Sequence, residues 1–397
     1  MFSNKKKDAN YISGKESRRI SRENRKITKE LEKKRERKHV DPSEYTAQMH
    51  DPNNVLEVDN LHTYFFTDIG TVKSVDGVSF DVPVGKTVGI VGESGCGKSV
   101  TSLSIMQLVQ RPTGQIVEGE IRFAGSDMVY DIAKTPTRVM QKIRGNQIAM
   151  IFQEPMTSLN PIFRIGMQIE EVLKLHYPDW DKEKVKARTI EMLEMVGIAN
   201  AEGVYRMYPH ELSGGMRQRI CIAMALACSP RLIIADEPTT ALDVTIQAQI
   251  LELLKDLRVK YKLTVVLITH DLGVVANIAD RVAVMYAGDI VEIGTADEIY
   301  YDPRHPYTWA LLSSMPQMGV KGEDLFNIQG TPPNLFAEIR GDAFAPRNPQ
   351  ALKIDFVKQP PYFDVTPTHK AKTWLLDPRA PRIEPPAVVR RLREEGM

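Results

Sequence analysis

The chain has 397 residues, of which 42% are hydrophobic and 26% charged, ordinary values for a globular protein that exclude a wholly disordered chain. Its longest apolar runs span a handful of residues, whereas a membrane helix needs about 20, and no apolar leader stands near the N-terminus. Three cysteines make neither a disulfide framework nor a metal cluster, so we expect a cytosolic site of action.

The formal net charge of +1 hides an asymmetry, because the first 40 residues carry 15 Lys and Arg against 6 Asp and Glu. This segment has a net charge of +9 and leaves −8 for the remainder. Ile20, Ile27 and Leu31 make only a thin apolar stripe, so we predict over residues 1–50 a solvated arm, helical or disordered, that packs on no core. Its positive charges could bind anionic lipid headgroups or RNA phosphates, or they could serve only to keep the chain soluble.

From Val55 onward, short apolar segments alternate with longer helical patterns. Four segments predict buried strands: 87–91, 148–152, 232–235 and 264–269. Because they are apolar on both faces, they indicate a parallel sheet covered by helices, the α/β class. Residues 282–287 and 290–293, joined at Gly288-Asp289, predict an antiparallel hairpin at the edge of the sheet.

The strongest single motif follows the first of these strands, where residues 92–99 read GESGCGKS and open a helix. Its glycines allow successive backbone N–H groups to surround an anion, Lys98 neutralises the β- and γ-phosphates of a nucleotide, and Ser99 ligates Mg²⁺. Cys96 is interpreted as a small filler whose thiol, if alkylated, would block nucleotide binding. The candidate nucleotide-binding residues here are Gly92, Ser94, Gly95, Cys96, Gly97, Lys98, Ser99 and Val100.

A second element, residues 231–238, reads RLIIADEP and places two carboxylates at a strand's C-terminal end. That end is the ligand-binding edge of a parallel sheet. Alone, the pair would be read as helix-capping or solvated residues. Beside a phosphate loop, Asp236 suits Mg²⁺ and Glu237 suits the general base that orients an attacking water.

Four further segments complete the pattern: FQEP at 152–155, LSGGMRQR at 212–219, ALD at 241–243 and ITHD at 268–271. Together the segments resemble an ATP-binding-cassette (ABC) ATPase, with Walker A at 92–99, the Q-loop at Gln153, the signature at 212–218, Walker B at 231–237, the D-loop at 240–243 and the switch histidine His270. This resemblance implies a P-loop fold with a RecA-like core, an antiparallel β subdomain and a helical subdomain at about 154–228, all within a nucleotide-binding domain at 51–304.

The resemblance also implies roles for single residues and a dimer. A Ser-Gly-Gly turn at a helix N-terminus is a second anion site, and in this family it closes over the nucleotide of a partner domain in head-to-tail pairing. The signature residues concerned are Ser213, Gly214, Gly215 and Gln218. Asp243 would cross that interface, His270 would sense the γ-phosphate, and Gln153 would contact Mg²⁺ and the attacking water. Without the family context they would be a turn residue, a core histidine and a strand-end amide.

Cassettes stack adenine on an aromatic ring shortly before the phosphate loop, which here falls on Tyr64, Phe65 and Phe66. Phe65 is the favoured candidate, and packing in the core is an equal alternative for each of the three.

Longer stretches narrow the resemblance to the oligopeptide, dipeptide and nickel import ATPases. They are residues 152–161, 305–312, 330–333 and 344–347. Met216 in the signature is similar to the residue found in the D-type subunit of the oligopeptide permease.

The family implies ATP and Mg²⁺ as cofactors. It also implies an F-type ATPase as heterodimer partner, two permease subunits, an external peptide-binding protein and a peripheral place on the cytoplasmic face of the cell membrane. Residues 156–175 are expected to receive the permeases. Oligopeptide import is the expected function, with dipeptide or nickel import as alternatives.

Residues 305–397 form a proline-rich, irregular extension, since 14 of the 25 prolines lie after residue 300. Many relatives carry four cysteines here that resemble iron–sulfur ligands, but the matching positions are Asp342, Asn348, Asp355 and the neighbourhood of Trp374. Thiolates are the ligands that such clusters need, so we expect no cluster. The extension either packs between the ATPase partners or along the exit path, or it is a passive stabiliser.

Other cassette ATPases fit less well. Translation factors carry two cassettes, chromosome ATPases insert a long coiled coil between Walker A and Walker B, and zinc-dependent repair members need CxxC pairs. Only the basic arm favours a non-transport role on nucleic acid or the ribosome, and we expect no specific nucleic-acid partner.

Overall fold

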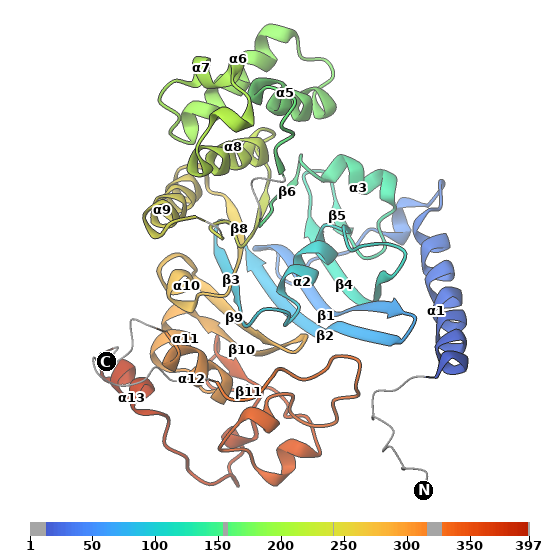
Figure 1. The fold of residues 1–397 in the computed structure, drawn as a ribbon, viewed down its shortest axis with the longest axis vertical. Coiled ribbons are helices and arrows are strands. Elements are labelled where there is room, and N and C mark those ends of the chain that lie inside the picture. The colour runs from blue at the N-terminus through green and yellow to red at the C-terminus, as the bar shows by residue number, and fades with distance from the viewer. Residues whose placement is uncertain (1–12, 154–157, 241, 316–327, 396–397) are drawn as a thin grey trace, which may run out of the picture.

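Two β-sheets form the centre of the molecule (Figure 1). The structure, a computed structural model, describes residues 13–153, 158–240, 242–315 and 328–395. The smaller sheet is antiparallel, with strand order β2-β1-β4-β5. Its strands are β1 (Asn54–Thr67), β2 (Gly70–Pro83), β4 (Gly114–Ala124) and β5 (Val129–Asp131).

The larger sheet has eight strands in the order β11-β12-β10-β9-β3-β8-β7-β6. Its strands are β3 (Thr87–Val91), β6 (Ile148–Ile151), β7 (Leu232–Asp236), β8 (Thr264–Thr269), β9 (Arg281–Tyr286), β10 (Asp289–Thr295), β11 (Phe363–Asp364) and β12 (Lys370–Ala371). Strands β9, β3, β8, β7 and β6 run parallel. The predicted α/β class with a parallel sheet is therefore confirmed.

Side-chain alternation along these strands divides the interior into two hydrophobic cores. In β7, Leu232 and Ile234 pack into the core shared with the smaller sheet, whereas Ile233 and Ala235 pack into the core shared with the helices. Because a strand points successive side chains to opposite faces, a strand covered on both sides must be apolar at every position. This explains the uninterrupted apolar runs in the sequence.

Apart from the N-terminal helix, the helices of the described residues lie in three places (Figure 1). A helical layer at the top of the view holds α5 (Ile165–His176), α6 (Lys182–Met195), α7 (Ala201–Arg206) and α8 (Gly214–Leu226). Around the sheets lie α2 (Lys98–Ile105), α3 (Thr137–Ile143), α9 (Val244–Tyr261) and α10 (Leu272–Ile278). The C-terminal third adds α11 (Ala296–Tyr301), α12 (Pro306–Ser313) and α13 (Ala387–Glu395), with short 3₁₀ turns between them.

The β9–β10 hairpin turns at Ala287 and Gly288, both at positive φ (48° and 89°), as tight antiparallel connections require. The prediction that this hairpin forms the sheet edge is wrong. Residues Lys370–Ala371 pair with β10, and β11 pairs with them in turn. Strands of two residues, far along the chain from the hairpin, leave no periodic signal in the sequence.

The N-terminal helix α1 (Gly14–Arg35) lies against β1, β2 and β4, at the right edge of Figure 1. The structure thus gives the helical form of the predicted arm, and neither hydrophobic core contains a residue of α1, but the helix is docked on the smaller sheet and does not extend freely into solvent. The docked face is polar: Asn24 donates to the carbonyl of Thr67 at 2.8 Å, and Glu32 accepts hydrogen bonds from Arg111 and Gln115. The weak apolar stripe did not predict this docking, because hydrogen bonds and an ion pair hold the helix in place.

The C-terminal extension shares its core with the cassette. Tyr307 and Phe344 are fully buried and pack on Tyr286 of β9, with ring centroids 4.5 and 5.3 Å away. The hydrophobic packing therefore continues across residue 305, where the extension was predicted to begin. Across the described ranges, no helix combines the length and the apolar composition that crossing a membrane requires.

Candidate active site

The phosphate loop connects β3 to α2 and folds closely against its neighbours. Gly97 precedes α2 at φ 107°, a left-handed conformation that favours glycine. A Cβ at Gly97 would lie 2.3 Å from the carbonyl oxygen of Ser74, and one at Gly92 would lie 2.1 Å from that of Met285. Both positions therefore require glycine for steric reasons.

Lys98 is only 4% exposed and points back along the loop. Its Nζ donates to the carbonyl oxygens of Gly92 and Glu93 at 2.8 and 3.0 Å. These bonds hold the ammonium group beside the glycine-rich loop, which is the place that a phosphate-binding lysine needs. Cys96 is buried, and burial raises the pKa of its thiol.

Walker A and Walker B meet at Asp236, the last residue of β7. Ser99 Oγ donates to Asp236 Oδ1 at 3.0 Å, and Ser102 Oγ lies 3.4 Å from Oδ2. Burial raises the pKa of Asp236, while the hydrogen bond from Ser99 opposes that rise. A hydroxyl and a carboxylate side by side are hard oxygen donors of the kind that Mg²⁺ prefers, so the residues present fit this ion.

The three predicted catalytic side chains converge on one carboxylate oxygen. Glu237 Oε2 accepts hydrogen bonds from Gln153 Nε2 at 3.0 Å and from Thr240 Oγ1 at 2.9 Å. His270 Nδ1 lies 3.6 Å from the same oxygen, and its side chain is 62% exposed. These residues follow β6, β7 and β8, whose carboxyl ends meet at one edge of the sheet.

The backbone also places Glu237. This residue has φ 45°, in the left-handed region, and its N–H donates to the carbonyl of Ile268 at 2.9 Å. The turn therefore holds Glu237 at the carboxyl ends of β7 and β8, the edge at which parallel sheets bind ligands.

Thr240, the first residue of the D-loop, belongs to this cluster, whereas the signature serine and the D-loop aspartate make their hydrogen bonds elsewhere. Ser213 and Asp243 cap α8 and α9 through hydrogen bonds from the N–H groups of Met216 and Ile246. Figure 1 shows both helices away from α2, on the side of the helical layer. A Cβ at Gly215 would lie 2.9 Å from Ile246, so the signature turn and the start of α9 form one surface. Ala241 lies outside the described residues.

Gln218 does not fit the role of a nucleotide contact in this conformation. Its side chain is fully buried, and its Nε2 donates to the carbonyl of Pro238 at 2.6 Å. It therefore links the signature helix to the segment after Walker B.

The aromatic candidates differ in their contacts. Tyr64 donates to Asp76 at 2.5 Å, and Phe66 is buried. Phe65 is half-buried on β1 between Val72 and Gly114. These contacts leave Phe65 as the candidate for stacking on adenine.

The sequence analysis missed several residues of the site. Thr240 is the first residue of the D-loop and Ser102 lies three residues after the phosphate loop, so their hydroxyl groups beside known motifs could have marked them as candidates. Glu93 contacts Tyr307 and Arg347 from the C-terminal extension. Those contacts join residues more than 200 positions apart, for which motif spacing gives no signal.

Comparisons with known proteins agree with this geometry. Residues 75–240 match the family model described as ABC transporter, and residues 291–354 match that of the oligopeptide/dipeptide transporter C-terminal region. The oligopeptide transport ATP-binding protein OppD of Bacillus subtilis is 57% identical over 337 residues, 85% of this chain and 93% of that protein. The dipeptide transport ATP-binding protein DppD of Lactococcus lactis is 55% identical over 331 residues, 83% of this chain and 93% of that protein.

Among solved structures, the dimeric ATP-binding cassette MJ0796 in a post-hydrolysis state with ADP and Pi has a TM-score of 0.53 and 28% identity. The match covers 61% of this chain and 98% of that one. The part of this chain beyond the match includes segments that the smaller cassette does not have.

The sheet, the phosphate loop and the carboxylate edge define a nucleotide-hydrolysing cassette protein. The chain belongs to the ABC ATPases, and among them to the ATP-binding subunits of oligopeptide and dipeptide importers. The predictions of this family, of the cassette fold and of an ATP-hydrolysing enzyme in peptide import are confirmed.

Proposed function

We propose that this chain energises oligopeptide import by hydrolysing ATP with the residues that converge on Asp236 and Glu237. The observation that carries the assignment is the meeting of Gln153, Thr240 and His270 at Glu237 Oε2, beside the Ser99–Asp236 hydrogen bond. A base that is held by neighbouring donors stays directed at one position, which is what activating a single water requires.

The residues have distinct tasks. Lys98 and the loop N–H groups bind the β- and γ-phosphates, and Ser99, Asp236 and Gln153 would hold Mg²⁺. When bound, this ion neutralises charge on the phosphates. Glu237 accepts the proton of the attacking water, and His270 donates toward the γ-phosphate.

The separation of the signature from the phosphate loop supports a dimer as the working unit. One chain offers a phosphate loop and, on another surface, the helix N-termini capped by Ser213 and Asp243. Because two half-sites cannot close on one nucleotide within this chain, they require a second cassette in head-to-tail pairing. We assign that partner as the F-type ATPase of the same transporter.

An exposed apolar loop after Gln153 supports docking of two permease subunits. Gln168 is buried and hydrogen-bonds the backbone of Asn160 and Phe163. This bonding shapes a loop that presents Ile162 and Phe163, 73% and 42% exposed, to the surface. The chain would thereby sit peripherally on the cytoplasmic side of the membrane, with an external binding protein delivering peptide. Of the segment expected to receive the permeases, residues 156 and 157 lie outside the described residues.

The extension is proposed to fold without an iron–sulfur cluster. Asp342 Oδ1 accepts from the N–H of Phe344 at 2.9 Å, and Asn348 Oδ1 accepts from that of Gln350 at 3.0 Å. Asp355 likewise accepts from the N–H of Leu352. These side chains close local turns by hydrogen bonds, and all three cysteines lie before residue 229.

Dipeptides are the second candidate cargo, because DppD of Lactococcus lactis is nearly as similar as OppD. The cassette has no contact with cargo in this scheme, so the binding protein decides between the two.

The test is recovery of partners with a tagged Glu237→Gln chain from native membranes, in mild detergent and with ATP, followed by mass spectrometry. We expect a second cassette ATPase, two permeases and a peptide-binding lipoprotein. Recovery of ribosomes or DNA-associated proteins instead would contradict the proposal. Two further variants locate the docking surface: Ile162→Glu should lose the permeases, whereas Val259→Glu, at an equally exposed valine on α9, should retain them.

A further inference from the structure

In the part of the chain that the structure describes, the C-terminal extension bonds to the phosphate loop through Glu93. Arg347 Nη1 and Nη2 donate to the two carboxylate oxygens of Glu93 at 2.6 and 3.0 Å. The Arg347 side chain is 5% exposed. A bidentate pair of this kind fixes both the position and the plane of the carboxylate.

A second contact holds the backbone of the same residue. The N–H of Glu93 donates to Tyr307 Oη at 2.8 Å. Tyr307 is buried against Tyr286 and Phe344, so its hydroxyl has a fixed position. The Arg347 guanidinium is also fixed, because it donates to Tyr286 Oη at 3.2 Å and to the carbonyl of Gln329 at 3.0 Å.

These contacts bear on the phosphate-binding lysine. The carbonyls of Gly92 and Glu93 are the two acceptors that hold Lys98 Nζ. Tyr307 binds the N–H of the peptide between Gly92 and Glu93, and Arg347 binds the side chain that follows it. A shift of Glu93 would therefore move both acceptors of Lys98.

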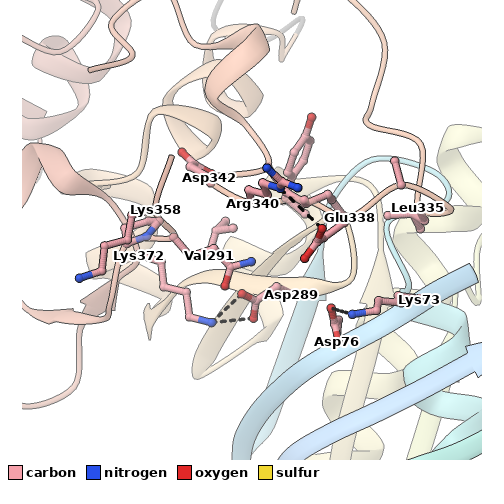
Figure 2. A pocket seen from close by; sticks show the side chains of 18 of the residues that line it. Lys73, Asp76, Asp289, Val291, Leu335, Glu338, Arg340, Asp342, Lys358 and Lys372 are labelled. Atoms are coloured by element: carbon pink, nitrogen blue, oxygen red, sulfur yellow. Dashed lines mark hydrogen bonds and ion pairs between the residues drawn. The ribbon is translucent and has the colours of Figure 1, made fainter. Parts of the chain in front are cut away.

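The extension touches the cassette near the nucleotide site at a second, separate place. The N–H of Lys73 on β2 lies 3.3 Å from the carbonyl of Leu335. Figure 2 shows the cavity of about 700 Å³ that the following residues line against β2 and the β9–β10 hairpin. The ion pairs Lys73–Asp76 and Lys372–Asp289 stand in its walls. This second contact lies on the walls of the cavity, whereas Tyr307 and Arg347, which do not line it, hold Glu93 independently of it.

We propose that Arg347 is a positioning residue for ATP binding, which acts through Glu93 to hold the phosphate loop and Lys98 in place. This inference rests on the proposed role of the loop. It makes the extension a functional part of the nucleotide site, in contrast to a passive stabiliser.

The test measures ATP binding to the full chain by calorimetry, together with thermal unfolding. Arg347→Gln should weaken ATP binding by about tenfold, the scale of one charge-assisted pair, and it should also lower the melting temperature of the nucleotide-free protein, because it leaves Glu93 without its partner. Arg340→Gln is the matched control, since Arg340 belongs to the same extension and is exposed; it should bind ATP normally. Arg347→Lys should recover part of the affinity because it keeps the charge.

Exchanging the two charges of the Glu93–Arg347 pair tests the inference without relying on one variant alone. Glu93→Arg and Arg347→Glu should each weaken ATP binding, and the double variant should bind better than either. In the assembled transporter, Arg347→Gln should raise the KM for ATP and leave kcat nearly unchanged. A lower melting temperature with unchanged ATP affinity would overturn the inference, as would a double variant no better than the single ones. Lys98→Ala distinguishes failure of this inference from failure of the proposed function. If the Lys98→Ala variant binds ATP normally, the proposed nucleotide site itself is wrong.

Discussion

Gln153 and Glu237 stand 84 positions apart in the sequence, yet their side chains are joined by a hydrogen bond of 3.0 Å. Gln153 begins the segment that presents Ile162 and Phe163 at the surface, and Glu237 is the proposed base. In the proposed scheme, this hydrogen bond would connect the strand end that precedes the docking loop to the base of hydrolysis.

Glu237→Gln should stop turnover without affecting ATP binding. Glutamine keeps the shape and still accepts from Thr240, but it cannot take a proton from water. We expect phosphate release by the assembled transporter to fall by about 10²- to 10⁴-fold, with ATP affinity unchanged by calorimetry. Glu252→Gln, at an exposed glutamate of α9, is the control and should hydrolyse normally. A near-normal rate in the Glu237 variant would remove this residue from the role of base.

Asp236→Asn should stabilise the nucleotide-free protein near neutral pH while abolishing hydrolysis. Burial raises the pKa of Asp236, so its contribution to stability is greatest when the carboxyl is protonated and is lost as the pH rises through that pKa. Asparagine carries no charge and avoids this loss. The melting temperature without Mg²⁺ should exceed that of the wild type at neutral pH, and the difference should vanish in acid. Asp68→Asn, at an exposed position, should show no such pattern, and a lower neutral melting temperature for Asp236→Asn would contradict the argument.

All three thiols should react slowly in the native protein. Burial raises the pKa of Cys96, that of Cys221 to about 12 and that of Cys228 to about 11, and the thiolate is the reactive form. Iodoacetamide at pH 8 should modify them only after denaturation, as measured by mass spectrometry. Fast labelling of Cys96 that ATP suppresses would show instead that the loop opens to solvent.

Glu32→Ala should destabilise the protein by about 1 kcal/mol, because it leaves Arg111 and Gln115 without their shared acceptor. Glu36→Ala is a matched control at the C-cap of the same helix: Glu36 is 68% exposed and 3.6 Å from Arg111, so its loss should cost little. The measurement is urea unfolding. Equal stabilities of the two variants would mean that α1 does not dock through Glu32 in solution.

Motifs and apolar runs predicted the centre of this molecule well. Four of the five parallel strands were visible because each is buried on both faces, and Lys98, Asp236 and Glu237 follow from their place at strand ends. Two features escaped for physical reasons. Helix α1 docks through Asn24 and Glu32, polar residues for which hydropathy predicts a place in solvent. Arg347 and Tyr307 reach Glu93 from more than 200 positions away, and only the folded chain reveals such a contact.

The pairing of Lys370–Ala371 with β10 also matters for the chain before it is assembled into the transporter. Without that short strand, β10 would present unpaired N–H and C=O groups at the border of the sheet, and such borders recruit strands from other molecules. A cassette cut back to its nucleotide-binding portion would then self-associate on synthesis or during purification. The proline-rich tail thus guards solubility before any assembly with membrane partners takes place.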